Sequence, residues 1–106
     1  MRRTVWSSDK FDRKLAMLFE EFEGREEELQ QRLNEAVKGL LDGSLGLARK
    51  HRTSDYTGAV PLMEGYVIVF SPRGPFRDGL DYIDISETSH LDLLNIEREP
   101  DSPSGG

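Results

Sequence analysis

The first part of the chain carries the polar and apolar pattern of a strand followed by a capped helix. A β-prone stretch at residues 4–6 precedes Ser7, Ser8 and Asp9, whose side chains can accept the free N–H groups at the start of a helix. Apolar residues then recur with the period of an α-helix. The residues of this stripe are Phe11, Leu15, Leu18, Phe19 and Phe22.

A second helical pattern begins after Gly24 and ends at Asp42 and Gly43, where glycine can take the left-handed conformation that closes a helix. Two consecutive amphipathic helices predict a helical hairpin that packs its apolar stripes on another layer. The residues of the second stripe are Leu29, Leu33, Ala36, Val37, Leu40 and Leu41.

The second half of the chain changes to the pattern of β-strands. Residues 66–70 form a continuous β-branched and aromatic run, and residues 80–85 are a second strand candidate. Residues 59–63 predict a short strand, in which Pro61 indicates an edge or a bulge because proline cannot donate a ladder hydrogen bond. Residues 91–96 fit either a strand or a short helix.

These elements predict an α+β fold in which an N-terminal strand and a two-helix hairpin pack on a small antiparallel sheet. With 106 residues the chain has the length of one domain, which we place at residues 1–98. Residues 99–106 are expected to form a flexible polar tail. The connection at residues 71–79 is long for a hairpin and rich in turn formers.

The composition limits the kinds of catalytic and metal site that the chain can form. The absence of cysteine excludes disulfides, thiolate catalysis and cysteine-based zinc sites, and His51 and His90 lack the spacing of a metal motif, so we expect no metal and no cofactor. Because the longest apolar run, residues 66–70, is far shorter than a membrane span and no signal peptide is visible, we expect a cytoplasmic protein without membrane contact.

Charge is divided along the chain. The formal net charge of −6 disfavours a nucleic-acid coat protein, since the whole chain would repel phosphates. Residues 20–35 hold seven glutamates and two arginines, typical of a solvated helix surface, whereas residues 45–77 hold five basic and two acidic residues. Arg49, Lys50 and Arg52 are the residues on which binding to a polyanion should depend, unless they only satisfy the end of a helix.

The order of strand, two-helix hairpin, loop and antiparallel sheet ending in a histidine segment resembles the RelE/ParE toxin superfamily, and its YafQ-like branch in particular. The resemblance covers about residues 3–96 and rests on order and spacing. The segments that carry it are residues 3–7 leading into Phe11, residues 45–47 through 55–58, residues 66–70 and residues 88–94.

The resemblance implies a ribosome-dependent mRNA endoribonuclease that inhibits translation and that a cognate antitoxin protein keeps silent. Attack by the RNA 2′-hydroxyl needs a base, an acid and cations around the phosphate. His90 matches the terminal histidine of the family and is the candidate acid or base, since an imidazole exchanges protons near neutral pH. Candidate phosphate contacts, chosen by their local chemistry, are Arg49, Lys50, Arg52, Arg73 and Arg77.

An alternative hypothesis is a non-catalytic binding protein on the same scaffold, acting on a protein partner such as DNA gyrase. Three positions favour it, because a histidine, a second histidine and an arginine of the YafQ-like branch are replaced by Ser54 or Asp55, Pro61 and Ser86. The contact element would be the 72–79 loop, where Phe76 lies between arginines.

Overall fold

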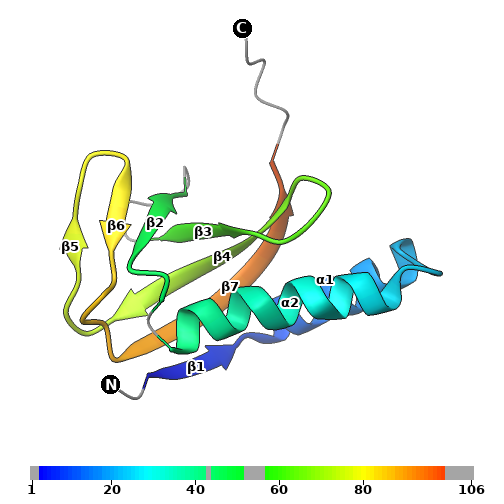
Figure 1. The fold of residues 1–106 in the computed structure, drawn as a ribbon, viewed down its shortest axis with the longest axis horizontal. Helices are drawn as coiled ribbons and strands as arrows, with labels where there is room; N and C mark the ends of the chain where they lie inside the picture. Colours follow the sequence, from blue (N-terminus) through cyan, green and yellow to red (C-terminus); the bar gives the residue numbers. More distant parts are fainter. Residues whose placement is uncertain (1–2, 43, 52–56, 100–106) are drawn as a thin grey trace, which may run out of the picture.

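The computed structural model describes residues 3–42, 44–51 and 57–99, which form two helices and one large sheet (Figure 1). The α+β class predicted from the sequence is confirmed. Neither helix in the described ranges is long and apolar enough to cross a membrane. The elements are β1 Thr4–Ser7, α1 Asp9–Glu21, α2 Glu26–Leu41, β2 Leu47–Lys50, β3 Gly58–Pro61, β4 Tyr66–Arg73, β5 Arg77–Asp78, β6 Tyr82–Asp84 and β7 His90–Arg98.

The seven strands of the described residues form a single mixed sheet in the order β1-β7-β4-β3-β2-β6-β5. β1 runs parallel to β7, with Thr4 paired with His90, and the other neighbouring pairs are antiparallel. The expectation of a small antiparallel sheet is therefore wrong in size and in strand direction. The parallel pair joins strands that are far apart in the sequence, and pairing at that distance produces no local pattern. β5 has only two residues, which are too few to show the alternation of a strand.

Both helices form where the sequence predicts them, and their apolar stripes pack on the sheet except at Leu41, which is 41% exposed at the end of α2. The Ser8 side chain caps α1 by accepting a hydrogen bond of 3.0 Å from the backbone N–H of Phe11. Gly24, in the link between the helices, has a φ of +92°, a conformation that favours glycine. The stripes turn toward the sheet, and their most buried members are Phe11, Leu18, Leu29 and Leu40, none more than 5% exposed.

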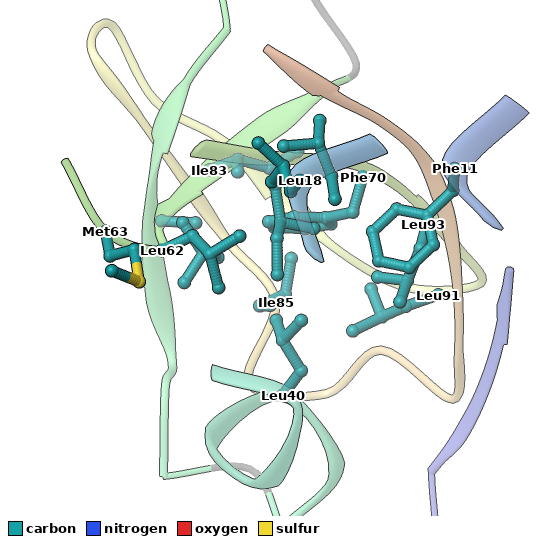
Figure 2. Close-up of a cluster of buried hydrophobic side chains, with 14 of the residues drawn as sticks. Phe11, Leu18, Leu40, Leu62, Met63, Phe70, Ile83, Ile85, Leu91 and Leu93 are labelled. Atoms are coloured by element: carbon teal, nitrogen blue, oxygen red, sulfur yellow. The ribbon is translucent and has the colours of Figure 1, made fainter. Parts of the chain in front are cut away.

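The hydrophobic core lies between the two helices and one face of the sheet, which we call the helix face (Figure 2). Phe70 of β4 is fully buried in this core, and Figure 2 shows Phe11 of α1 beside Leu93 of β7. Gly58 of β3 lies so close that a Cβ atom on it would be 2.6 Å from the Phe70 ring. Glycine at position 58 therefore leaves room for the Phe70 ring, the largest fully buried side chain among the described residues.

Arg3 fastens the start of the chain to the rim of the core. Its side chain is 6% exposed and donates hydrogen bonds to the backbone carbonyls of Thr88, Leu40 and Ile85, the first at 2.8 Å between Nε and oxygen. Desolvation by burial lowers the pKa of the Arg3 guanidinium. One cation thus connects β1, the end of α2 and the segment before β7.

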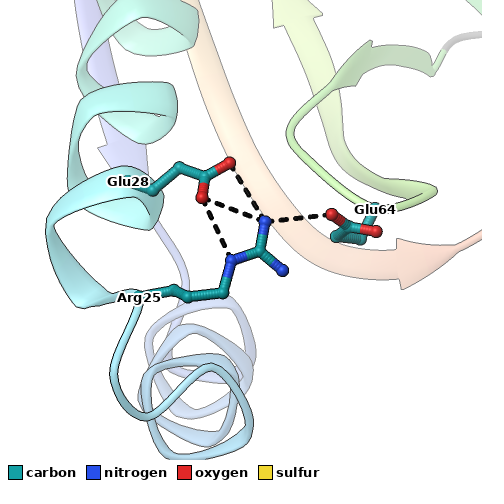
Figure 3. Close-up of polar contacts among 3 residues, drawn as sticks. All are labelled: Arg25, Glu28 and Glu64. Atoms are coloured by element: carbon teal, nitrogen blue, oxygen red, sulfur yellow. Dashed lines mark hydrogen bonds and ion pairs between the residues drawn. The ribbon is translucent and has the colours of Figure 1, made fainter.

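A tight hairpin joins β3 to β4. Glu64 and Gly65 both have positive φ, 51° and 84°, as a two-residue type I′ turn requires. The tip of the helical hairpin is attached to this turn, because Arg25 contacts Glu64 at 3.0 Å and Glu28 at 2.9 Å (Figure 3). These two carboxylates raise the pKa of Arg25, the hydrogen bond to Glu64 contributing most.

In the described ranges, the two prolines in the strands, Pro61 and Pro72, lie at positions where one neighbouring strand no longer pairs. Within the described residues, β4 pairs with β3 from Val67 to Phe70 and with β7 along its whole length, so β7 is the strand that Pro72 faces there. Pro61 ends β3 beyond the residues that pair with β2, which explains why an apparent edge residue occurs in an interior strand. The strand predicted at residues 66–70 is confirmed and extends to Arg73, and residues 91–96 are strand rather than helix.

Other segments differ in extent from their predictions. Within residues 80–85 only β6 is strand, and Leu80 is 91% exposed before it. The 71–79 connection includes the end of β4 and all of β5, and Phe76 is partly buried where it packs against the core. Glu99, assigned to the tail, donates its N–H to the Gly65 carbonyl at 2.9 Å, and residues 100–106 lie outside the described ranges.

Candidate functional site

The sheet has a second face, which we call the open face. A small buried cluster on this face consists of Ala59, Val67 and Val69, all of them strand residues. Strand alternation places Leu91 and Leu93 of β7 in the core and turns His90 and Asp92 to the open face. An irregularity in the pairing of β4 with β7 follows, after which Asn95 and Glu97 point to the open face. The outward side of β7 is therefore a row of polar residues.

Four side chains gather at one end of this row, and we call them the Trp6–His90 cluster: Trp6, Arg73, His90 and Asp92. The His90 Nε2 atom lies 2.9 Å from Asp92 Oδ1, and Arg73 Nε lies 2.6 Å from Asp92 Oδ2. The side chains of His90 and Asp92 are 24% and 22% exposed, whereas that of Arg73 is 73% exposed. One carboxylate thus orients both an imidazole and a guanidinium at the surface.

This arrangement has defined chemical capacities. Asp92 fixes the His90 ring, so that its other nitrogen, Nδ1, can exchange a proton with a bound molecule. Arg73 uses Nε on Asp92, and its side chain is 73% exposed, which leaves its terminal amino groups accessible to a phosphate oxygen. The cluster can therefore combine proton transfer with binding of an anion.

Sequence reasoning found His90 and Arg73 but missed the other two members of the cluster. The signal for Asp92 was present, because two residues separated by one position lie on the same face of a strand. Trp6 left no such signal, since it joins the cluster through the parallel pairing of β1 with β7, where Trp6 is the partner of Asp92. The Trp6 and His90 ring centroids are 6.1 Å apart.

At the other end of the polar row, ion pairs bridge the open face. His51 Nε2 lies 3.2 Å from Glu97 Oε1, and Arg49 forms an ion pair with Glu99. Glu99 raises the pKa of Arg49. These contacts join the β2 side of the sheet to the end of β7 across β3 and β4, whose outward residues there, such as Val67, are only 3% exposed.

The structure does not bring all the predicted phosphate contacts together. Lys50 lies beside Arg49 in β2 but forms an ion pair with Asp78 of β5. Arg77 lies on β5 at the far edge of the sheet, where it pairs in register with Asp84 and lowers the pKa of that carboxyl, after the larger effect of hydrogen bonds from Ser86. Arg52 lies outside the described residues.

No group of three or more histidine, aspartate or glutamate side chains within residues 3–42, 44–51 and 57–99 is arranged to hold a metal ion. The acidic run of residues 20–35 is spread along the exposed sides of the two helices, as the sequence predicts for a solvated surface.

Comparison of the chain with protein-family models, with curated proteins and with solved structures finds no match.

Proposed function

We propose that this protein is an RNA-cleaving toxin of the RelE/ParE type that acts in the cytoplasm on mRNA at the ribosome, with the Trp6–His90 cluster as its active site. The observation that carries the proposal is the contact of His90 and Arg73 with the same carboxylate, that of Asp92. It supports the proposal because it joins a proton acceptor to a phosphate-binding cation on an accessible surface.

The reaction proceeds by attack of the RNA 2′-hydroxyl oxygen on the adjacent phosphorus. The O2′–P bond forms and the P–O5′ bond breaks, which leaves a 2′,3′-cyclic phosphate and a free 5′-hydroxyl. His90 takes the proton of the 2′-hydroxyl, and Arg73 stabilises the charge on the phosphate oxygens. The leaving 5′ oxygen takes its proton from water, because the cluster holds a single imidazole and is open to solvent.

Expression of the protein in cells, followed by primer-extension mapping of mRNA ends, tests the proposal. We expect cleaved messages and arrested growth with the unchanged chain. His90→Ala should reduce cleavage by about 10²–10⁴-fold, the usual contribution of a general acid or base. Identical uncut messages and identical growth with both proteins would exclude the nuclease hypothesis.

A matched pair of arginines tests the phosphate contact. Arg73→Gln should weaken cleavage, because it removes the cation from the cluster, whereas Arg13→Gln changes an exposed residue of α1 and should leave cleavage unchanged. Equal cleavage by both variants would show that Arg73 does not contact the scissile phosphate.

A protein-binding function is favoured by a second surface, formed by exposed apolar residues around β2 and β6. Leu47, Leu80 and Tyr82 are 59%, 91% and 55% exposed. Leu47 and Tyr82 lie on paired strands, two positions apart in register. Exposed apolar residues that lie together are typical of a surface that contacts another protein, and a cognate antitoxin or a protein target would bind there. If Leu80→Ser and Tyr82→Ser abolish copurification of a partner while RNA remains uncut, the binding function replaces the nuclease function.

A further inference from the structure

Trp6 is an exposed aromatic residue that the cleavage chemistry does not use. It is the one tryptophan of the chain, and 63% of its surface is exposed. Its neighbour Val5 packs against the core, so strand alternation turns Trp6 to the open face. Because most of the indole is exposed, it contributes little burial energy to the fold, and its surface is accessible to a ligand.

The position of Trp6 relative to the cluster is set by three neighbouring strands. Trp6 lies on β1, His90 and Asp92 lie on β7, and Arg73 lies opposite His90 on β4. Two strand spacings separate the outer members, a distance of roughly 10 Å. An aromatic face, an imidazole and a guanidinium therefore follow one another across the sheet.

We propose that Trp6 is the stacking platform for a nucleobase of single-stranded RNA, next to the nucleotide whose phosphate binds Arg73. This inference rests on the proposed function and names a binding subsite within it. Single strands bind to proteins by stacking unpaired bases on aromatic rings while cations follow the backbone. The row from Trp6 to Arg73 offers both kinds of contact on one accessible face.

The surroundings of Trp6 favour a nucleic acid over a protein partner. Its neighbours on the open face are His90, Asp92 and the hydrophilic Thr4, which pairs with His90. Aromatic anchors in protein interfaces lie in well-packed pockets surrounded by contacts that exclude water. The exposed apolar residues Leu47 and Tyr82 lie on β2 and β6, which are close to the edge of the sheet opposite β1.

The fluorescence of the full chain provides a direct test, since its single tryptophan is the residue in question. The probe is a short mixed-sequence RNA oligonucleotide carrying 2′-O-methyl groups, which bind without providing the attacking hydroxyl. We expect saturable quenching of Trp6 fluorescence that weakens as salt rises. Inorganic polyphosphate, which has the charges without the bases, should give little quenching.

Variants at position 6 measure the contribution of stacking through the anisotropy of a labelled probe. Trp6→Ala should weaken binding by about 5- to 150-fold, the range for one stacked base, and Trp6→Phe should retain most of the affinity. Met17→Ala, the matched control, removes another large exposed apolar side chain, from α1, and should leave affinity unchanged. Circular dichroism confirms that each variant is folded.

The outcomes separate this inference from the proposed function. If the unchanged chain cuts RNA but Trp6→Ala binds the probe as tightly as before, the stacking platform is wrong and the nuclease function stands. If no RNA is cut but binding depends on Trp6, the platform stands and the nuclease function fails. Quenching of equal size by polyphosphate, or by a protein partner alone, overturns the platform.

Discussion

The two faces of the sheet are organised by different interactions. On the helix face, fully buried residues such as Phe70 and Leu91 pack against α1 and α2, and the cation at its rim, Arg3, is satisfied by backbone carbonyls. On the open face, cations are paired with carboxylates, as in the contact between Arg73 and Asp92. The contacts of the helix face exclude water, whereas water reaches the ion pairs of the open face.

This difference separates stability from function. Charged and polar groups in a water-excluded site are costly to leave unpaired, whereas exposed ion pairs contribute little because water and salt screen them. Substitutions on the open face therefore change the surface chemistry at small cost to the fold. A reactive set such as His90 and Asp92 can be placed there without being required for folding.

The largest effect is expected from Arg3. Arg3→Met removes the donors of three backbone carbonyls near the core while retaining much of the side-chain volume. We expect the free energy of unfolding to fall by about 3–5 kcal/mol, because three backbone carbonyls lose a charged donor and each buried acceptor left unsatisfied costs about 1–3 kcal/mol. Chemical denaturation measures this change.

Arg13→Met provides the matched control for Arg3→Met. Arg13 is exposed on α1, so its replacement should change the free energy of unfolding by no more than about 0.5 kcal/mol. Equal small losses in the two variants would contradict the view that Arg3 holds the first strand to the core.

Gly58 should show the next largest effect. A Cβ atom at position 58 would lie 2.6 Å from the Phe70 ring, whereas one at Gly46 would lie 3.7 Å from its nearest neighbour, Ser86. Gly58→Ala should therefore lower the free energy of unfolding by about 1–3 kcal/mol, the usual cost of overpacking. Gly46→Ala should be close to neutral, and thermal unfolding of both variants compares them.

The helix face was largely predictable from the sequence because its information is local. The stripe from Phe11 to Phe22 has one period, and Ser8 caps it as residues of its type usually do. The size of the sheet was not predictable, since the pairing of Thr4 with His90 joins residues at opposite ends of the chain. A two-residue strand such as β5 carries no period at all.

The site was predictable only in part, for a related reason. His90 and Arg73 were chosen for their chemistry, and antiparallel pairing of β4 with β7 then brings them opposite each other. Arg49 and Lys50 are adjacent in sequence, but their ion pairs lead to Glu99 and Asp78 in different strands. Neighbouring positions of a strand point to opposite faces, so a run of basic residues does not make one patch.

A smaller effect on stability is expected on the open face. The side chains of Arg49 and Glu99 are 52% and 36% exposed. Glu99→Gln should lower the free energy of unfolding by less than about 1 kcal/mol, and high salt should reduce the difference further. A loss as large as that of Arg3→Met, unchanged by salt, would show that the bridged end of this face is as essential to the fold as the core.

The smallest effect is expected where the helix layer meets the sheet, at Tyr66. The Tyr66 hydroxyl donates to Glu21 Oε2 at 2.6 Å, and this hydrogen bond, followed by burial, raises the pKa of the phenol above its ordinary value. The folded chain therefore holds this proton more strongly than the unfolded chain. The resulting stability is fully present below the ordinary pKa of a phenol and is lost as the pH rises through the raised value.

Ultraviolet absorbance of tyrosinate during an alkaline titration measures this effect, with Tyr66→Phe to assign the signal. Glu21→Gln should return the pKa of Tyr66 toward its ordinary value, because the charged acceptor is lost. Glu20→Gln changes the adjacent exposed carboxylate on α1 and should leave the titration unchanged. If Tyr66 ionises at the ordinary phenol pH in the unchanged chain, the contact with Glu21 does not persist in solution. The end of α1 would then contribute as little to the free energy of unfolding as the ion pairs of the open face.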